Sequence, residues 1–469
     1  MANSIAITNP RTGEPDFQLI CHELSDVMAK SKQLRLAQKK WWQLSLQDRI
    51  KYLQIFAQAI TALKPSFVEA LIDDTGRANE SMLEVDVVIG AIDRWCRQAP
   101  ELLATQAERS GEIPFLAIKQ SYLPYPVVGI ISPWNFPLLL SLVDAIPALL
   151  AGCSVLLKPS EVTSRVTKPL IKAISEVPML AEVFSVVTGG GQTGEAVSEV
   201  ADLICFTGSV ATGRKVGEAC AKRFIPAFLE LGGKDPAIVC EDADLDVAAK
   251  ALCWGSMVNA GQSCMSLERV YVNKNIADAF IAKLVTEVKQ LSHNFPNINQ
   301  GEIGPIIAPS QVDIVKRQLA DAKVKGAQFL TGGRVVELGG GYYCQPTIVS
   351  NISDDMDIIN QETFAAILPV VIVDTDQEAI RKANNSDFGL SAAVFSQNVE
   401  HAEQIALQLE AGAISINDAS LTALVHEAEK QSFKYSGLGG SRMGNVSIHR
   451  FMRKKAFIRN TGVPSPWWF

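Results

Sequence analysis

The chain has 469 residues, of which 48% are hydrophobic and 20% charged. This length exceeds one ordinary hydrophobic core, so we expect a globular protein of two or three lobes rather than a disordered chain. The formal net charge of -7 at pH 7 argues against a dedicated nucleic-acid-binding protein.

Two features of the sequence bear on its location. Residues 1–5 place no basic segment before an apolar core, so we expect no signal peptide and a cytoplasmic protein. The longest apolar region, residues 136–157, contains Asp144 and two prolines. Because charge in the middle of a bilayer is costly, this region predicts a buried helix entered after a strand and no membrane span.

The first third of the chain is predicted to be mainly helical. Residues 1–30 are polar and turn-rich, which predicts a surface lead-in. Residues 24–106 have helical apolar spacing, as in Leu53 and Phe56, and no strong strand signal. Residues 113–128 combine apolar residues with prolines, which predicts an extended ribbon at a sheet edge.

After this ribbon, short apolar strands alternate with helices. The expected strands are 127–131, 154–158, 183–187, 203–206, 236–239, 269–272, 370–373 and 392–395, and the clearest expected helices are 211–223, 244–258 and 277–291. Such alternation implies parallel, doubly wound sheets whose ligands bind at the carboxyl ends of strands.

The segment from Glu230 to Cys264 sets an acid and a thiol beside glycines, which is typical of a nucleophile with a base nearby. A thiol attacks as thiolate, and at an ordinary pKa of about 8.5 only a few per cent is ionised near neutrality. The simpler interpretation is a buried, inert cysteine. The nine cysteines include no C-x-x-C pair, and the five histidines are never four residues apart, so neither a disulfide framework nor a metal site is predicted.

Three further motifs point to a nucleotide and to catalysis. Gly208 and Gly213 lie five residues apart at a strand-to-helix turn, where a pyrophosphate could bind, although Arg214 and Lys215 rule out a Walker A loop. The motif 158–161 ends in an acid suited to a ribose. The Asn in motif 132–137 is a candidate oxyanion donor. Taken singly, each motif could equally be a plain turn.

Together these motifs resemble the aldehyde dehydrogenase superfamily over roughly residues 5–460. The resemblance rests on six motifs in the family's order: Pro133-Trp134-Asn135-Phe136-Pro137, Leu157-Lys158-Pro159-Ser160-Glu161, Phe206-Thr207-Gly208-Ser209, Glu230-Leu231-Gly232-Gly233-Lys234, Gly261-Gln262-Ser263-Cys264 and Glu362-Thr363-Phe364. It implies an NAD(P)-dependent, non-acylating enzyme that oxidises an aldehyde to the acid.

The resemblance also implies an α/β fold with two doubly wound parallel-sheet lobes, one of them Rossmann-like, and a small β-ribbon oligomerisation arm. The implied domains are a cofactor domain over 1–229, whose ribbon 113–127 belongs to the arm, a catalytic thiol domain over 230–430, and a C-terminal oligomerisation segment with an aromatic tail over 431–469. A homodimer or tetramer is therefore expected.

By resemblance, Cys264 is the nucleophile that forms a thiohemiacetal and then a thioester, Asn135 an oxyanion donor, and Glu230 the base that activates water. The implied cofactor-binding residues are Ile131, Ser132, Pro133, Trp134, Lys158, Ser160, Glu161, Gly191, Phe206, Thr207, Gly208, Ser209, Gly213, Leu231, Glu362 and Phe364. The acid at 161 favours NAD, with NADP as an alternative, because a carboxylate repels a 2′-phosphate.

The substrate is predicted from an expected apolar tunnel, lined by Phe136, Leu139, Leu140, Val143 and Met265. Succinate-semialdehyde dehydrogenases resemble this stretch but tend to carry Arg at the position of Val143. Because a carboxylate without a partner is costly in a dry tunnel, we expect hydrophobic aldehydes to be preferred over acidic ones.

Several features depart from the family pattern or leave rival functions open. Ala365-Ala366-Ile367 replaces a common Gly-Pro-Val, the loop 429–437 lacks a usual Phe-Gly-Gly, and the tail Trp467-Trp468-Phe469 is unusual. A CoA-acylating or a semialdehyde dehydrogenase is the alternative within the fold. An inactive binding protein would be expected to lose Cys264, Glu230 or Asn135, and a thiol hydrolase would leave the nucleotide motifs unexplained.

Overall fold

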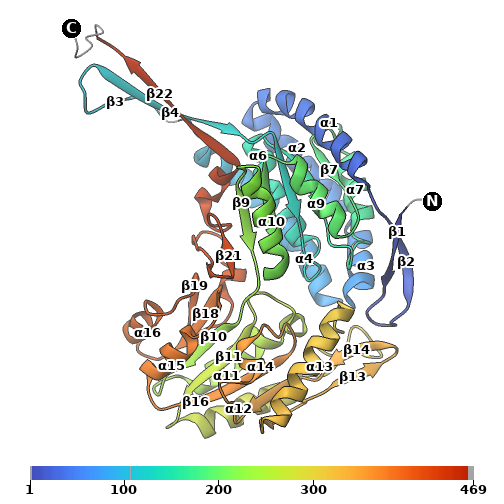
Figure 1. The fold of residues 1–469 in the computed structure, drawn as a ribbon, viewed down its shortest axis with the longest axis vertical. Coiled ribbons are helices and arrows are strands. Elements are labelled where there is room, and N and C mark those ends of the chain that lie inside the picture. The colour runs from blue at the N-terminus through green and yellow to red at the C-terminus, as the bar shows by residue number, and fades with distance from the viewer. Residues whose placement is uncertain (1–2, 106, 463–469) are drawn as a thin grey trace.

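The computed structural model describes residues 3–105 and 107–462. Two mostly parallel sheets form the centres of an upper and a lower lobe in Figure 1, and a thin antiparallel arm projects from the upper one. The predicted α/β fold with two mostly parallel sheets and a small ribbon is confirmed. The aromatic tail at 467–469 lies outside the described residues.

The sheet of the upper lobe has six strands in the order β21-β9-β8-β5-β6-β7. Its strands are β5 (Val127–Ile131), β6 (Ser154–Lys158), β7 (Phe184–Val186), β8 (Leu203–Thr207), β9 (Ala227–Glu230) and the short antiparallel β21 (Gly437–Leu438). Every residue of β5, β6 and β8 is buried, which explains their continuous apolar runs. The predicted positions of these strands were correct to within one residue.

Helices cover this sheet. They are α1 (Leu24–Gln43), α2 (Leu46–Ala62), α3 (Lys64–Thr75), α4 (Asn79–Leu102), α7 (Thr167–Ser175), α8 (Pro178–Ala181), α9 (Gly191–Val200) and α10 (Val210–Lys222). The predicted helical layer over 24–106 is confirmed by the first four. Within the described chain no single helix is long and apolar enough to cross a membrane; only α2 and α3 together, bent by 67°, meet the length and composition test.

Two sequence-based expectations for this lobe were wrong. Residues 1–30 are more than a surface lead-in, because β1 (Ser4–Thr8) and β2 (Pro15–Ile20) pair as a hairpin. The region 136–157 is not one helix: α5 (Leu139–Leu142) and α6 (Ala145–Ala151) are separated at Asp144, and β6 follows. Asp144 is buried and forms ion pairs with Arg442 and Arg450, and these pairs stabilise the break between α5 and α6.

The sheet of the lower lobe has seven strands in the order β12-β15-β16-β11-β10-β18-β19. The strands are β10 (Asp235–Val239), β11 (Leu267–Asn273), β12 (Gln328–Phe329), β15 (Thr347–Ser350), β16 (Ile367–Val373), β18 (Ser391–Phe395) and β19 (Ala413–Ile416). Around it lie α11 (Leu245–Met257), α12 (Ala277–Lys289), α13 (Pro309–Val324), α14 (Asp357–Asn360), α15 (Asp376–Asn384) and α16 (Val399–Ala406).

Both sheets are wound in the same way. In the upper lobe the first strand, β5, has β6 and then β7 on one side and β8 and then β9 on the other. In the lower lobe β10 has β11 and β16 on one side and β18 and β19 on the other. Each sheet therefore reverses its strand order beside its first strand, which is where open α/β sheets bind ligands.

The connection between the sheets decides which edges meet. Only residues 231–234 separate the end of β9 from the start of β10. Because all strands except the edge strands β21 and β12 run parallel within their sheet, the carboxyl edge of the upper sheet lies beside the amino edge of the lower one.

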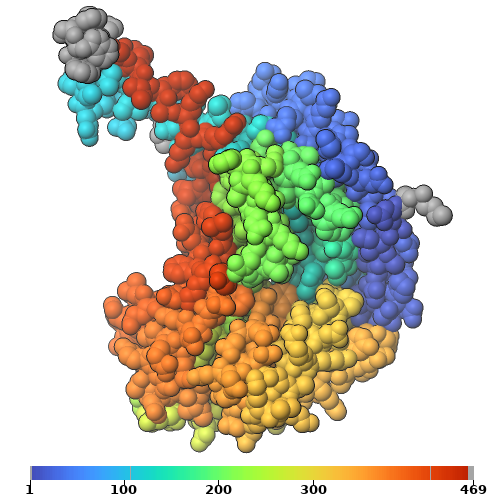
Figure 2. All heavy atoms as spheres, viewed as in Figure 1, coloured from blue at the N-terminus to red at the C-terminus, as the bar shows by residue number. Residues whose placement is uncertain are grey.

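The arm consists of β3 (Arg109–Ser110), β4 (Leu116–Pro124) and β22 (Met452–Asn460). β22 pairs antiparallel with β4 along its whole length, from Met452 opposite Pro124 to Asn460 opposite Leu116. Figure 2 shows the arm extending from the body, with β3 and β4 in cyan and β22 in red. The remaining short elements are β13 (Val335–Leu338), β14 (Gly341–Cys344), β17 (Phe388–Gly389), β20 (Phe433–Lys434) and three 3₁₀ helices at Val258–Gly261, Leu421–Ala423 and Asn445–Phe451.

Candidate active site

The predicted cofactor residues of the upper lobe lie at one edge of its sheet. Ile131 ends β5, Lys158 ends β6, Thr207 ends β8, and Leu231 follows β9. The other residues of the set follow the ends of β5, β6 and β8, except that Gly191 follows β7 and Phe206 is one residue before the end of β8: Ser132, Pro133, Trp134, Ser160, Glu161, Gly191, Phe206, Gly208, Ser209 and Gly213. The edge flanks the point between β5 and β8 where the strand order reverses.

An accessible carboxylate and two helix N-termini make this edge suitable for binding a dinucleotide. Lys158 Nζ lies 2.6 Å from Glu161 Oε2, and the Glu161 side chain is 37% exposed, so its carboxylate is accessible. Ser209 caps α10, and Gly191 is the first residue of α9, where an added Cβ would meet no atom within 4 Å. Two helix N-termini therefore face the edge, and such termini favour anionic groups.

Cys264 follows a backbone segment that is strained. Asn259, Ala260 and Gly261 have φ values of 54°, 54° and 72°. A Cβ at Gly261 would lie 2.2 Å from the Ala365 carbonyl, so only glycine fits there. Residues in this left-handed region cost about 1–3 kcal/mol each unless the surroundings hold them, which is a feature of functional sites. The alanines at 365 and 366, which depart from the family pattern, pack directly against the segment before the thiol.

Gly233 brings Glu362 and Cys264 together. The Gly233 N–H donates to Glu362 Oε1 at 3.0 Å, and a Cβ on Gly233 would lie 2.4 Å from the Cys264 carbonyl oxygen. Gly233, three residues after Glu230, therefore allows three chain segments to approach at backbone distance. Sequence reasoning placed these residues in one site, and the structure shows the contacts that join them.

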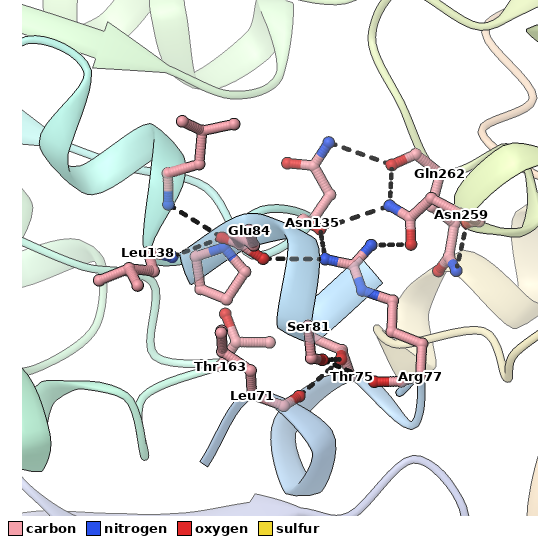
Figure 3. A network of polar contacts seen from close by, with 12 residues as sticks. Leu71, Thr75, Arg77, Ser81, Glu84, Asn135, Leu138, Thr163, Asn259 and Gln262 are labelled. Carbon is pink, nitrogen blue, oxygen red and sulfur yellow. Dashed lines mark hydrogen bonds and ion pairs between the residues drawn. The ribbon is translucent and has the colours of Figure 1, made fainter. Parts of the chain in front are cut away.

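Asn135 is buried next to the cysteine segment (Figure 3). Its Nδ2 donates to the Gln262 carbonyl oxygen at 3.1 Å. Its own carbonyl oxygen accepts from Arg77 Nη2 at 2.7 Å and from Asn259 Nδ2 at 3.3 Å. Asn135 therefore links the end of β5 in the upper sheet to the segment before Cys264 in the lower lobe.

An ion pair behind Asn135 was missed from the sequence. Arg77 Nη2 lies 3.2 Å from Glu84 Oε2, and both side chains are nearly fully buried. Glu84 Oε1 accepts from the N–H groups of Leu138 and Leu139 at 2.8 and 2.9 Å (Figure 3). The pair thus supports Asn135 from both sides. The sequence signal was two opposite charges seven residues apart, with Glu84 on α4 and Arg77 two residues before that helix begins.

A second missed network supports Phe364. Lys234 Nζ donates to Glu268 Oε2 at 2.7 Å and to Thr363 Oγ1 at 2.8 Å. Glu268 in turn accepts from the N–H groups of Thr363 and Phe364, both at 2.8 Å. The Phe364 ring meets the Trp134 ring edge-on, with centroids 5.3 Å apart. This contact joins the two predicted cofactor segments across the boundary between the sheets.

The surroundings of Cys264 raise the pKa of its thiol, whereas the surroundings of an activated thiol lower it. The pKa of Cys264 is raised to about 11, mainly by burial. The charge of Lys430 opposes this shift, and the carboxylates of Glu230, Asp235 and Glu362 add to it. The thiol is therefore protonated at neutral pH without a substrate or cofactor, and Lys430 is the group that favours the thiolate. Burial also raises the pKa of Glu362 to about 8, with Glu268 adding to the shift and the Gly233 N–H opposing it.

Glu230 is half-buried at the end of β9, and Ser432 Oγ donates to its Oε2 at 3.2 Å. Arg442 Nη2 donates to Thr207 Oγ1 at 2.5 Å and to Asp144 Oδ2 at 3.0 Å. Burial opposes the Arg442 charge, but the carboxylate of Asp144 and then that of Glu230 raise its pKa above the ordinary value. Lys430 and Ser432 come from the loop 429–437, where the family pattern breaks, and Arg442 follows that loop, so no roles were predicted for the three residues.

The structure gives the position and burial of the residues that were predicted to line a substrate tunnel. Four of these residues are half-buried and follow Asn135 up to the C-terminal cap of α5: Phe136, Leu139, Leu140 and Val143. Met265 adjoins Cys264, and the Thr422 hydroxyl donates to its sulfur at 3.1 Å. The tunnel itself stays a prediction.

Comparisons with known proteins agree with this geometry. The model of the "Aldehyde dehydrogenase family" matches residues 1–457. A relative from Mycolicibacterium smegmatis, "Putative succinate-semialdehyde dehydrogenase [NADP(+)]", is 35% identical over 88% of this chain and 81% of its own. The solved structure of "Putative Aldehyde Dehydrogenase PutA" from Anabaena variabilis superposes with a TM-score of 0.98 at 48% identity, covering all of both chains. Betaine aldehyde dehydrogenase from Staphylococcus aureus, solved with NAD⁺, gives a TM-score of 0.92 at 29% identity, covering 100% of this chain and 94% of its own.

Proposed function

This chain belongs to the aldehyde dehydrogenase family and oxidises aldehydes to acids with NAD(P)⁺, and we propose that Cys264, Glu230 and Asn135 carry out that reaction. The observation that supports this assignment best is the approach of three segments at Gly233. Glu362 binds the Gly233 N–H at 3.0 Å, and the Gly233 Cα faces the Cys264 backbone. A thiol, a buried acid and the carboxyl edge of a dinucleotide-type sheet thus converge at one point.

In the proposed reaction the Cys264 sulfur adds to the aldehyde carbon, and the thiol proton passes to solvent or to a neighbouring base. The Asn135 amide has two N–H donors, and only one of them is used by Gln262 in the described structure. The second is suited to the oxyanion that develops on the former carbonyl oxygen. Loss of such a donor typically costs about 10²–10³ in rate.

Glu362 and Phe364 are the residues that would hold a nicotinamide, which would supply the hydride acceptor needed to convert the Cys264 adduct into a thioester. Glu230, at the end of β9, then takes a proton from water, the resulting hydroxide attacks the thioester carbon, and the C–S bond breaks to release the acid and the Cys264 thiolate, which can take up the proton held by Glu230. Ser432, which donates to Glu230 Oε2 at 3.2 Å, orients this carboxylate. The Glu230 base also argues against CoA as the acyl acceptor, because transfer to a thiol needs no activated water.

We further propose that NAD is used in preference to NADP. Glu161 pairs with Lys158 at 2.6 Å but keeps an accessible carboxylate at the end of β6. A carboxylate accepts hydrogen bonds from ribose hydroxyls and repels a 2′-phosphate. Comparison of kcat/KM for the two cofactors tests this, and a preference for NADP would contradict it.

For the substrate we propose hydrophobic aldehydes. The support is the apolar stretch from Phe136 to Val143, which directly follows Asn135. One observation favours a second class, carboxylated aldehydes: the Lys430 ammonium is near enough to Cys264 to lower its pKa. A bound carboxylate would find a cation there.

An assay of NADH formation with hexanal and with succinate semialdehyde separates the two classes. We expect a higher kcat/KM for hexanal, and a Val143→Arg variant should shift the preference towards the semialdehyde. A clear advantage of the semialdehyde in the parent enzyme would refute the apolar class. Cys264→Ala should abolish turnover with both substrates, and Cys21→Ser, at a partly exposed thiol in another part of the chain, should not.

We also propose that the arm joins two subunits. All but the first residue of β22 are exposed, including Phe457 and Ile458 at 50% and 68%. Exposed apolar residues on a projecting ribbon favour burial against a partner. Light scattering should show a dimer or tetramer, and a stable monomer would contradict this.

A further inference from the structure

The lower sheet has its own point of strand reversal, and the proposed chemistry does not use it. β10 and β18 are neighbours, and the chain continues from their carboxyl ends to helices (Figure 1). Cys240 directly follows β10, and its N–H donates to the Phe395 carbonyl oxygen, at the end of β18, at 3.0 Å. Open α/β sheets bind ligands at such a point, outside the carboxyl ends of the strands.

Three side chains with metal-binding atoms meet there. The Cys240 sulfur, one Asp376 carboxylate oxygen and one His401 ring nitrogen all lie within 4.8 Å of one another. His401 Nε2 is 2.8 Å from Asp376 Oδ2. Cys240 is buried, whereas the His401 and Asp376 side chains are 44% and 25% exposed, so the group is open to solvent on one side.

The fold holds the three residues in place independently of one another. Asp376 is the first residue of α15, and Thr375 caps that helix by accepting from the Glu378 N–H at 3.2 Å. His401 lies in the first turn of α16, where its own N–H donates to the capping Asn398 side chain at 3.0 Å. The ligand atoms therefore come from a strand end and two capped helix starts, which are rigid positions.

We propose that Cys240, Asp376 and His401 form a binding site for a zinc-like divalent cation. Sulfur, imidazole nitrogen and carboxylate oxygen are the donors that Zn²⁺ uses, and three protein ligands leave a fourth position for water. A thiolate ligand disfavours Mg²⁺ and Ca²⁺, which prefer oxygen. On binding, the Cys240 thiol releases its proton to solvent and a sulfur–metal bond forms, so no oxidant or reductant is needed.

Without a bound cation, the Cys240 thiol is expected to be unreactive as a nucleophile. Burial, and then the nearby carboxylates of Asp376 and Asp242, raise the pKa of Cys240 to about 12. A neutral, buried thiol is a poor nucleophile, so the arrangement is not a second catalytic cysteine. A bound cation would reverse this balance by adding positive charge next to two carboxylates and the sulfur. The sequence predicted no metal site because the three ligands are widely separated along the chain.

The site is separate from Cys264. Cys240 is at the carboxyl edge of the lower sheet, whereas Cys264 precedes the amino end of β11. The five residues of β10 span roughly 16 Å between these edges. The cation would bridge the ends of β10, α15 and α16, and its role would be to stabilise the lower lobe rather than to act on the substrate.

The test is an anaerobic titration of the full-length, chelator-treated Cys264→Ala protein with Co²⁺, a spectroscopic substitute for Zn²⁺. Cys264→Ala removes the partly exposed thiol of the proposed active site, and the control variant Cys21→Ser covers Cys21, which is also partly exposed. We expect one equivalent to produce the near-ultraviolet thiolate-to-cobalt band and the intense visible bands of a four-coordinate site. Adding Cys240→Ser should abolish the near-ultraviolet band, and adding His401→Ala should weaken binding at least tenfold. Cys21→Ser, in the same background, should change neither.

A second measurement covers variants that fail to fold. One equivalent of Zn²⁺ should raise the Tm of the Cys264→Ala protein, because a ligand that binds only the folded state stabilises it. The same addition should not raise the Tm when His401→Ala is present, and the exposed His401 side chain makes that variant the one most compatible with folding. A cobalt band that survives Cys240→Ser, or no band and no Tm rise in the Cys264→Ala protein, would overturn the proposal.

Discussion

Arg77 and Glu84 form an ion pair, 3.2 Å from Nη2 to Oε2, in which the two side chains are only 4% and 1% exposed. The pair stands behind Asn135, because Arg77 also donates to the Asn135 carbonyl oxygen at 2.7 Å. Removing one partner of a buried ion pair leaves an uncompensated charge, which costs about 3–5 kcal/mol.

Arg77→Met should therefore lower the free energy of unfolding by about 3–5 kcal/mol, measured by urea denaturation. Arg35→Met is the matched control, because the Arg35–Asp202 pair is 41% and 26% exposed and such pairs contribute about 0–1 kcal/mol. The double variant Arg77→Met, Glu84→Gln should recover part of the loss. Equal losses in the Arg77 and Arg35 variants would contradict the role assigned to the buried pair.

Glu230→Gln should separate hydride transfer from hydrolysis. If Glu230 activates the water, the first turnover proceeds and the thioester then persists on Cys264. Rapid mixing should show a burst of NADH close to one per active site, followed by a much slower steady rate. Mass spectrometry should detect the acylated Cys264 peptide. A variant with no burst but an equally reduced rate in every turnover would place Glu230 in an earlier step.

Lys430→Met should make the thiol of Cys264 harder to ionise. The Lys430 cation favours the thiolate, so its removal should raise the pKa of Cys264 further above its present value of about 11. At a fixed mildly alkaline pH, alkylation of the Cys264 peptide by iodoacetamide should slow several-fold, and the rate profile should move to higher pH. Lys434→Met, on the same loop but paired with Glu410, is the control. No difference between the two variants would show that the Lys430 charge does not act on the sulfur.

Glu362→Gln should change how stability depends on pH. The folded-state pKa of about 8 is above the ordinary value of 4.5, so the folded protein holds this proton more tightly than the unfolded chain does. The contribution of Glu362 to stability is therefore present below its unfolded pKa and is lost as pH rises towards about 8, by at most about 1.4 kcal/mol per pH unit.

Gln keeps an acceptor for the Gly233 N–H and cannot ionise. The Tm of Glu362→Gln, minus that of the parent without cofactor, should consequently increase from about pH 5 to about pH 8. Glu337→Gln, at an exposed residue of β13, should give a difference that does not change with pH. A falling difference for Glu362→Gln would show that the carboxylate form is stabilised in the folded state.

Local sequence accounted well for the strands and for the membership of the family. Fully buried parallel strands such as β5 and β8 read as short apolar runs, and the glycines at 233 and 261 marked places where backbones approach each other. The lead-in was read as a surface segment because the alternation in β1 and β2 is short and the turn residues between them dominate. The break at Asp144 was missed because its partners, Arg442 and Arg450, are about 300 residues away in the chain.

By itself, the sequence determined the fold class and the family and predicted which thiol, acid and amide act in catalysis, because each of these depends on residue type and short-range spacing. Only the tertiary structure decided what surrounds them: Arg77 and Glu84 behind Asn135, Lys430 near Cys264, and the cluster of Cys240, Asp376 and His401. The reason is physical. Ion pairing, desolvation and metal-ligand geometry depend on distances of a few ångströms between segments that are far apart in the chain, and no local pattern records those distances.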